Sequence, residues 1–385
     1  MFTFAFRRPV VLAACLVAVL SLGACSMFSK EDARYDPAPL TDYKPGLSVR
    51  QVWSVSIGSG GGFGFYPSVV GESVYAAAPN GTVGKYDLLS GRTLWRADAK
   101  ADLTAGAGSD GTTTVVATSG GDVIAFDDTG KQKWKVRATS EVDEPPLVNN
   151  GLVVVRSGDY RITAYDARNG DRVWSVQRPG PALALRTSTQ MIMAQGLVIA
   201  GLAGGKMMAI SADSGNVQWE GTVATPKGGS DLERLNDVVG APRLVGPLMC
   251  AVAYQGRIVC FDVSQGGRPV WAKEFSGAVG LGADENAVYA PDSHSVVHAY
   301  SLRDGTEMWK QDALRNRHLT APVPIGPAIA VGDYDGYVHF LSRTDGRLLA
   351  RLSVGGNAVL SPLQTTPQGV LVQTGNGNLV LIGTN

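Results

Sequence analysis

The sequence has few of the residues that carry out most enzyme chemistry. It contains four histidines and four cysteines in 385 residues, and no two cysteines are adjacent. A Gly-x-Ser-x-Gly nucleophile motif and a Gly-Lys-Ser/Thr phosphate loop are both absent. His294 and His298 are four residues apart. That spacing aligns two metal ligands on a helix, whereas their surroundings predict a turn and a strand. We therefore expect no catalytic residue, no metal site and no cofactor.

The sequence also lacks an excess of charge of either sign. It has 34 Lys and Arg against 34 Asp and Glu, and no basic stripe runs along it, so nucleic acid is not an expected partner. Long apolar runs are missing as well. The apolar segment from Val10 to Leu22 has 13 residues, which is too few to cross a bilayer as a helix.

Residues 1–24 resemble a lipoprotein signal peptide. Two arginines precede the apolar segment, and the box Leu-Gly-Ala-Cys ending at Cys25 follows it. In bacterial lipoproteins the cysteine of such a box becomes the lipidated first residue. Cys15 fits a looser box, but it lies too close to the arginines, so we expect lipid on Cys25 and a flexible tether over residues 25–48. Ser26 follows in place of the aspartate that retains lipoproteins at the inner membrane, which favours the periplasmic face of the outer membrane.

What the sequence does contain is a repeat marked by a rare residue. Each tryptophan ends a unit such as Ala164, Asp166, Gly170 and Trp174. A further copy has Ala350 in the tryptophan position, and the last copy stops before that position is reached. The tryptophans recur at intervals of 38 to 52 residues, at positions 53, 95, 134, 174, 219, 271 and 309.

The repeat predicts the fold. Each copy alternates short apolar runs with turn signals and begins with a proline-bearing run, which gives four strands in about 40 residues. Repeated radially, such a unit is a propeller blade. We predict an all-β fold for residues 49–385, an eight-bladed β-propeller of four-stranded antiparallel blades. The N-terminal run from Val49 to Ser54 is expected to close the last blade, and the tryptophans are expected to wedge between adjacent blades.

Two cysteines lie within the predicted propeller. Cys250 and Cys260 flank a predicted turn and could face each other across a hairpin. An exported protein meets an oxidising compartment, which favours a disulfide. Two small thiols packed in the sheet are the alternative, and the sequence leaves both open.

The repeat resembles that of the quinoprotein dehydrogenases, which bind pyrroloquinoline quinone in an eight-bladed propeller. The alternative function is therefore a periplasmic quinone-dependent oxidoreductase. Those enzymes carry adjacent cysteines near the quinone, a calcium site and long insertions between blades. This sequence has no adjacent cysteines and joins its blades with almost no insertions, so we expect a non-enzymatic propeller.

Two stretches break the rhythm of the repeat. The first contains Leu183, Leu185 and Arg186. The second, residues 225–238, contains Asp237 and a predicted short helix from Asp231 to Leu235. Leu183 and Leu185 alternate, so in an extended segment both would point to one face. They could be exposed anchors beside Arg186 or buried leucines of a blade, and the residues alone do not decide.

Together with the lipoprotein box and the eight blades, these stretches resemble the BamB family, the lipoprotein subunits of the machinery that inserts β-barrel proteins into the bacterial outer membrane. The resemblance covers the whole chain. It implies a scaffold that binds the periplasmic POTRA domains of the BamA-type barrel subunit through Leu183, Leu185, Arg186 and Asp237, and it leaves open whether nascent outer-membrane proteins bind. The family has a further aspartate where this chain has Val239, so one electrostatic contact is expected to be lost or replaced.

Overall fold

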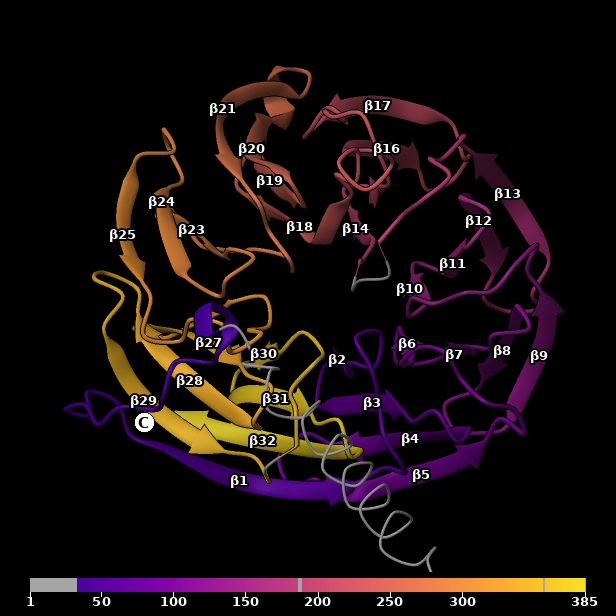
Figure 1. Cartoon of the computed structure of the whole chain (residues 1–385). Coiled ribbons are helices and arrows are strands. Elements are labelled where there is room, and N and C mark those ends of the chain that lie inside the picture. The colour runs from indigo at the N-terminus through magenta and orange to yellow at the C-terminus, as the bar shows by residue number, and fades with distance from the viewer. Residues whose placement is uncertain (1–32, 186–188, 356, 385) are drawn as a thin grey trace, which may run out of the picture. The chain divides into compact units, whose positions relative to one another are not determined.

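Eight four-stranded antiparallel sheets are arranged around a central axis in the computed structural model (Figure 1). The structure describes residues 33–185, 189–355 and 357–384. In seven blades the four strands follow one another along the chain, from the innermost strand to the outermost strand. The predicted fold class is therefore confirmed. A proline-bearing run supplies the innermost strand in five blades, at β2, β10, β18, β26 and β30, whereas β6, β14 and β22 form without one.

Blade 1 contains β2 (Ser68–Val70), β3 (Ser73–Ala77), β4 (Thr82–Asp87) and β5 (Thr93–Asp98); blade 2 contains β6 (Gly108–Ser109), β7 (Thr114–Ala117), β8 (Asp122–Phe126) and β9 (Gln132–Arg137); blade 3 contains β10 (Leu147–Asn149), β11 (Leu152–Ser157), β12 (Arg161–Asp166) and β13 (Arg172–Gln177); blade 4 contains β14 (Ile192–Ala194), β15 (Leu197–Leu202), β16 (Lys206–Ser211) and β17 (Val217–Thr222). Blade 5 contains β18 (Val238–Val245), β19 (Leu248–Ala253), β20 (Gly256–Asp262) and β21 (Arg268–Phe275); blade 6 contains β22 (Gly282–Ala283), β23 (Ala287–Pro291), β24 (Val297–Ser301) and β25 (Glu307–Gln311); blade 7 contains β26 (Val323–Ile325), β27 (Ala328–Gly332), β28 (Tyr337–Ser342) and β29 (Leu348–Ser353); blade 8 contains β30 (Gln364–Thr366), β31 (Gly369–Gln373), β32 (Asn378–Thr384) and β1 (Val49–Ser56).

The two ends of the propeller meet in blade 8. Strand β1 pairs antiparallel with β32, with Val49 opposite Thr384 and Trp53 opposite Leu381. The N-terminal strand predicted to close the last blade is thus confirmed. Closure leaves no half-formed blade whose exposed edge could pair with another chain. Residues up to Ala38 form a separate unit, in which the structure describes the 3-10 turn η2 (Ala33–Tyr35). No helix within the described residues is long and apolar enough to span a membrane.

The tryptophans join neighbouring blades. Trp174, on β13, packs against Gly215 in the turn between β16 and β17, where an added Cβ atom would come within 2.8 Å of the indole. Its Nε1 donates a hydrogen bond to the backbone oxygen of Ala212 in the same turn, at 2.6 Å. Five junctions make this bond, through the pairs Trp53–Leu88, Trp134–Ala167, Trp174–Ala212, Trp271–Leu302 and Trp309–Arg343. The predicted wedge role is confirmed by these contacts.

The length of the receiving turn decides whether the indole is hydrogen-bonded. In the five complete junctions this turn has six residues, as in 211–216 between the paired Ile210 and Val217. The turn facing Trp95 is one residue shorter, 127–131, and the turn facing Trp219 is one residue longer, 262–268. The indole nitrogen of Trp95 is buried without a partner. That of Trp219 has no hydrogen-bond partner within the described residues.

The blade 7–8 junction has no tryptophan. Ala350 lies opposite Phe340, the register position that tryptophan takes in other blades. Blade 8 has no turn leading from its third strand to its outer strand, because β1 arrives from the N-terminal side. Instead, the backbone nitrogens of Gly46 and Leu47 donate to the oxygen of Leu349 at 2.9 and 3.3 Å. Leu47 packs on the apolar cluster of blades 7 and 8.

Blade 5 contains the cysteine pair and follows the predicted helix. Cys250 and Cys260 are register partners on β19 and β20, are fully buried, and are joined by a disulfide with a Cα–Cα distance of 4.1 Å. The predicted helix from Asp231 to Leu235 is wrong, because these residues form only turns. Forming one helical turn fixes the backbone of several residues in return for very few hydrogen bonds. A helix of this length is therefore unstable without further turns.

Candidate functional site

The two irregular stretches are neighbouring connections on one face of the propeller. Residues 178–191 lead from β13 to β14, and residues 223–237 lead from β17 to β18. Beside them is a cavity of about 780 Å³, lined by parts of blades 3 and 4, by both connections and by the loop before β2. Phe63, Leu183 and Leu202 contribute apolar surface to this cavity. Its lining contains basic side chains, such as Arg178, and acidic ones, such as Glu141.

The first connection is held at its start by blades 3 and 4. Arg178 Nε donates to Glu220 Oε1 on β17 at 2.9 Å. The Tyr160 hydroxyl donates to the backbone oxygen of Pro181 at 2.9 Å. Gly180 lies so close to the Tyr160 ring that a Cβ atom there would be 2.2 Å from it. The connection therefore folds over Tyr160, and glycine is required at the point of closest approach.

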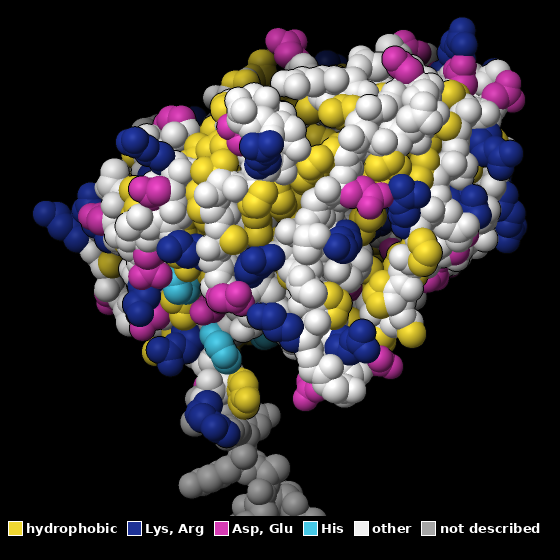
Figure 2. Space-filling view, turned by 90° about the horizontal axis from the view of Figure 1, so that it is seen from above, with side chains coloured by type: hydrophobic (Ala, Val, Ile, Leu, Met, Phe, Trp, Pro, Cys, Tyr) yellow, Lys and Arg dark blue, Asp and Glu magenta, His cyan; other side chains and the backbone are white. Residues whose placement is uncertain are grey.

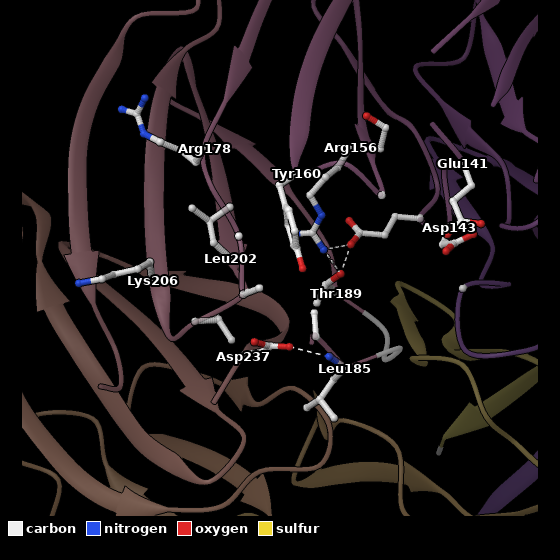
Figure 3. Close-up of a pocket in the computed structure, with 18 of the residues that line it drawn as sticks. Glu141, Asp143, Arg156, Tyr160, Arg178, Leu185, Thr189, Leu202, Lys206 and Asp237 are labelled. Carbon is white, nitrogen blue, oxygen red and sulfur yellow. Dashed lines mark hydrogen bonds and ion pairs between the residues drawn. The ribbon is translucent and has the colours of Figure 1, made fainter. Parts of the chain in front are cut away.

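Asp237 holds the middle of the first connection. It is 4% exposed and ends the second connection. Its Oδ2 accepts a hydrogen bond from the backbone nitrogen of Leu185 at 2.6 Å (Figure 3). Its Oδ1 accepts one from the backbone nitrogen of Gly204 at 2.9 Å. A hydrogen bond to a buried charged group contributes about 1.5–3 kcal/mol. Asp237 thus ties the two connections and the β15–β16 hairpin together.

A buried cluster around Arg156 holds the end of the first connection. Arg156, on β11, donates to Glu144 and to the Thr189 hydroxyl (Figure 3). It also donates to the backbone oxygen of Gly201 at 2.5 Å. Burial lowers the pKa of Arg156 to about 10, although the charge of Asp237 acts in the opposite direction. The guanidinium is therefore protonated at neutral pH. It joins blades 3 and 4 to the connection before β10, through Glu144, and to the first connection, through Thr189.

The structure separates the predicted partner-binding residues by exposure. Leu183 is 42% exposed. Leu185 is half-buried and packs on the cluster that contains Val239. Both leucines line the same cavity, and their segment is not a strand. Asp237 is buried and faces the protein. Val239 is buried within β18, and Arg186 lies outside the described residues.

Tyr160 is a site residue that the sequence argument missed. It has φ 62° in the turn between β11 and β12. The equivalent turns place Gly81, Gly121 and Gly336 at φ between 80 and 90°, and one of them places Ser295 at φ 62°. A left-handed conformation costs a non-glycine residue about 1–2 kcal/mol. Aligning the eight repeats would have shown a tyrosine at a glycine position, which is the signal of a residue kept there for another reason.

Two of the four histidines lie within reach of carboxylates. His298 lies with Nε2 3.5 Å from Asp292 and Nδ1 3.2 Å from Glu307. His339 is fully buried, with Nε2 2.8 Å from Asp333. Within the described residues, no group of three or more metal-ligating side chains is arranged to hold an ion.

The surface of the propeller is electrically mixed. Figure 2 shows acidic, basic and apolar side chains interspersed over the side that it displays. No large field of one sign is present there to draw in a partner from a distance.

These observations define a class of protein, an eight-bladed propeller of quinoprotein-type repeats with a built-up loop surface over blades 3 to 5. A family model described as outer membrane protein assembly factor BamB matches residues 79–311 and 293–384. The chain belongs to this family. A relative of that name from Bordetella pertussis is 66% identical over 99% of this chain and 98% of its own length. One from Burkholderia pseudomallei is 42% identical over 97% of each.

Solved structures agree with this assignment. The crystal structure of BamB from Moraxella catarrhalis superposes with a TM-score of 0.81 at 26% identity, covering 87% of this chain and 100% of that one. Quinohemoprotein alcohol dehydrogenase from Comamonas testosteroni matches with a TM-score of 0.67 at 14% identity, covering 87% and 76%. The latter likeness shows a shared fold and nothing about activity.

Proposed function

We propose that this chain is a non-enzymatic scaffold in outer-membrane protein assembly, which binds the periplasmic POTRA domains of a BamA-type barrel subunit through residues 178–189. The names of its relatives support the assembly role. The observation that carries the binding site is that Leu183 is 42% exposed in a described stretch, residues 178–185, that Tyr160 and Asp237 hold through hydrogen bonds. A loop already ordered in its bound form loses less entropy on association, which raises affinity.

In this proposal the predicted residues have different roles. Leu183 contacts the partner, because its side chain is exposed at the mouth of the cavity. Asp237 is a positioning residue, because its carboxylate faces the Leu185 backbone and not solvent. The family's additional aspartate is not replaced by a charge at the same place, since Val239 is buried in the core of blade 5. Arg186, outside the described residues, remains a proposed contact.

The proposed location follows from the N-terminal region. Residues 1–24 are proposed to be a signal peptide, Cys25 the lipidated residue, and residues 25–48 a tether to the periplasmic face of the outer membrane. Cys25 lies outside the described residues. A tether of this length spans on the order of 25–30 Å as a flexible coil, so the propeller, residues 49–385, would be held near the membrane surface.

An affinity measurement tests the proposed binding site. We expect Leu183→Ala to weaken binding of purified POTRA domains about tenfold, the effect of losing about 1.4 kcal/mol of contact energy. Val173→Ala is the matched control, because Val173 is 46% exposed but lies on the outer strand β13, and its affinity should be unchanged. Unchanged affinity in Leu183→Ala, with unchanged thermal stability in both variants, would contradict the proposal.

A further inference from the structure

We infer that residues 40–47 form a strap docked on blade 7, and that, given the proposed lipidation of Cys25, the rim of blade 7 is the side of the propeller held nearest the lipid surface. Residues 39–48 belong to the same compact unit as the propeller. Within this unit blade 7 lies across the ring from blade 3, from which the proposed binding connection leaves (Figure 1). The lipid anchor and the binding connection are therefore attached to opposite sides of the propeller.

The backbone of the strap lies against the outer strand of blade 7. The nitrogens of Gly46 and Leu47 both donate to the backbone oxygen of Leu349, and a Cβ atom added to Gly46 would come within 2.8 Å of Leu349 Cδ2. Leu40, Tyr43 and Leu47 are half-buried, whereas the strap residues between them are exposed. The strap thus turns one side to the blade and the other to solvent.

The other blades show what this strand looks like without a strap. On five outer strands the residue before the tryptophan is apolar and between 36 and 47% exposed, namely Val52, Leu94, Val173, Val270 and Met308. Leu349 takes this position in blade 7 and is 4% exposed. The strap therefore covers an apolar position that five blades leave open to water, and removing this surface from water favours the docked state.

Arg351, on β29, holds the N-terminal half of the strap. Its guanidinium carbon lies 5.7 Å from the centre of the Tyr43 ring and 5.7 Å from the centre of the Tyr337 ring. Its Nη1 also donates to the backbone oxygen of Thr41 at 3.5 Å. A cation above an aromatic ring is attracted by the electrons of the ring face. The equivalent position on β25 of blade 6 is Lys310, which is exposed.

Docking shortens the reach of the lipid anchor. The part of the proposed tether that precedes the strap is residues 26–39. These residues span on the order of 20 Å as a flexible coil and about 50 Å when fully extended. Because they join the propeller at blade 7, they hold this rim close to the lipid, and the binding connection on the opposite side stays open to a partner.

Hydrogen exchange tests the docking of the strap. The amides of Gly46 and Leu47 are followed by mass spectrometry in the full-length lipoprotein, solubilised in detergent. We expect Arg351→Ala to speed their exchange about fivefold, the effect of losing one cation–π contact. Lys310→Ala is the matched control and should leave the rate unchanged.

A second variant separates the strap from the rest of blade 7, because Arg351 also contacts Tyr337. Tyr43→Ala leaves β28 and β29 intact and should speed exchange as much as Arg351→Ala does. The double variant should exchange no faster than either single variant, since the two side chains act as a pair.

Energy transfer to lipid tests which rim faces the membrane. The full-length chain is placed in vesicles of phosphatidylethanolamine and phosphatidylglycerol that contain a headgroup-labelled acceptor lipid. A donor dye is attached through Ser353→Cys, at the end of β29, or through Gln177→Cys, at the equivalent end of β13 in blade 3. An added cysteine is labelled selectively, because Cys250 and Cys260 are bridged and Cys25 is the proposed lipid site. Transfer should be roughly twice as efficient from residue 353, because the short tether holds blade 7 nearer the lipid.

The outcomes distinguish the strap from the proposed location. Equal exchange rates in Arg351→Ala, Tyr43→Ala and Lys310→Ala would overturn the docked strap. Equal transfer from residues 353 and 177, on a chain bound to the vesicles, would overturn the membrane-facing rim. If the wild-type chain does not associate with the vesicles, the proposed lipidation of Cys25 fails and the membrane-facing rim fails with it, while the exchange rates still decide whether the strap is docked.

Discussion

The junction between blades 3 and 4 and the junction between blades 7 and 8 are equivalent places in the ring that are built differently. At the first, Trp174 covers Gly215 and donates to the backbone of Ala212 in the next blade. At the second, Ala350 stands in the tryptophan position, and Leu47 covers the core from outside. Both junctions are buried, with Ala350 4% and Trp174 7% exposed.

The difference between these junctions lies in the neighbouring blade. Trp174 has a partner because blade 4 contains a turn that joins its third strand to its outer strand. Blade 8 has no such turn, since its outer strand is β1. A tryptophan at position 350 would have no glycine to cover and no carbonyl to bind. The tryptophan of the repeat is therefore a feature of the contact between two blades and not of the strand that carries it.

Removing the indole at a complete junction should produce the largest effect. Trp174→Ala deletes a buried aromatic side chain and leaves the Ala212 carbonyl without its partner. Large-to-small changes of this kind destabilise a protein by about 3–5 kcal/mol. Urea titration followed by circular dichroism measures the loss of unfolding free energy. Val173→Ala, one residue away and exposed, should change it by less than about 1 kcal/mol.

A small effect of Trp174→Ala would contradict the comparison. It would mean that neighbouring blades hold together without the indole, as blades 7 and 8 do. The m-value of the titration should match that of the wild type, because a changed slope would indicate a different unfolded or native state and not a simple loss of stability.

The sequence predicts the propeller well because the blades share one repeat, so the strands of one copy predict the strands of the others. The position of β1, the missing tryptophan at residue 350 and the proline-bearing inner strands all follow from counting repeats. The reason for Ala350 does not follow, because it depends on a turn that is absent from a different blade. Trp95 and Trp219 lack the hydrogen bond because the turns that face them, 127–131 and 262–268, differ by one residue from the other turns. The sequence shows these lengths, but only the fold shows that each turn faces an indole.

The site was less predictable for a related reason. Leu183, Leu185 and Asp237 were identified by resemblance, but alternation did not show that Leu183 is exposed whereas Leu185 is half-buried against blade 5. An irregular connection has no fixed period, so its side-chain directions are set by distant anchors. Here those anchors include Tyr160 and the Arg156 cluster, which are brought to the connection by the fold and not by proximity in the sequence.

Adding a methyl group to the receiving glycine should have the next largest effect. Gly215 has φ 74° and touches Trp174, whereas Gly196, in the first hairpin of the same blade, has φ 75° and nothing within 4 Å of an added Cβ. Gly196→Ala should cost about 1–2 kcal/mol, the expense of a left-handed backbone. Gly215→Ala should cost about 1–3 kcal/mol more from overpacking against the indole. Equal losses of unfolding free energy would show that the tryptophan contact is unimportant.

The smallest expected effect distinguishes the contribution of the indole hydrogen bond from that of the packing of the indole side chain. Trp174→Phe and Trp95→Phe remove the same atoms, but only Trp174 has a hydrogen bond to lose, since the Trp95 nitrogen is buried without a partner. Leaving a buried carbonyl unpaired costs about 1–3 kcal/mol, so Trp174→Phe should be the more destabilising by about that amount. Removing an unpaired N–H offsets part of the lost packing in Trp95→Phe. If both variants lose equal unfolding free energy, turn length has no energetic consequence, and all seven tryptophans act through packing alone.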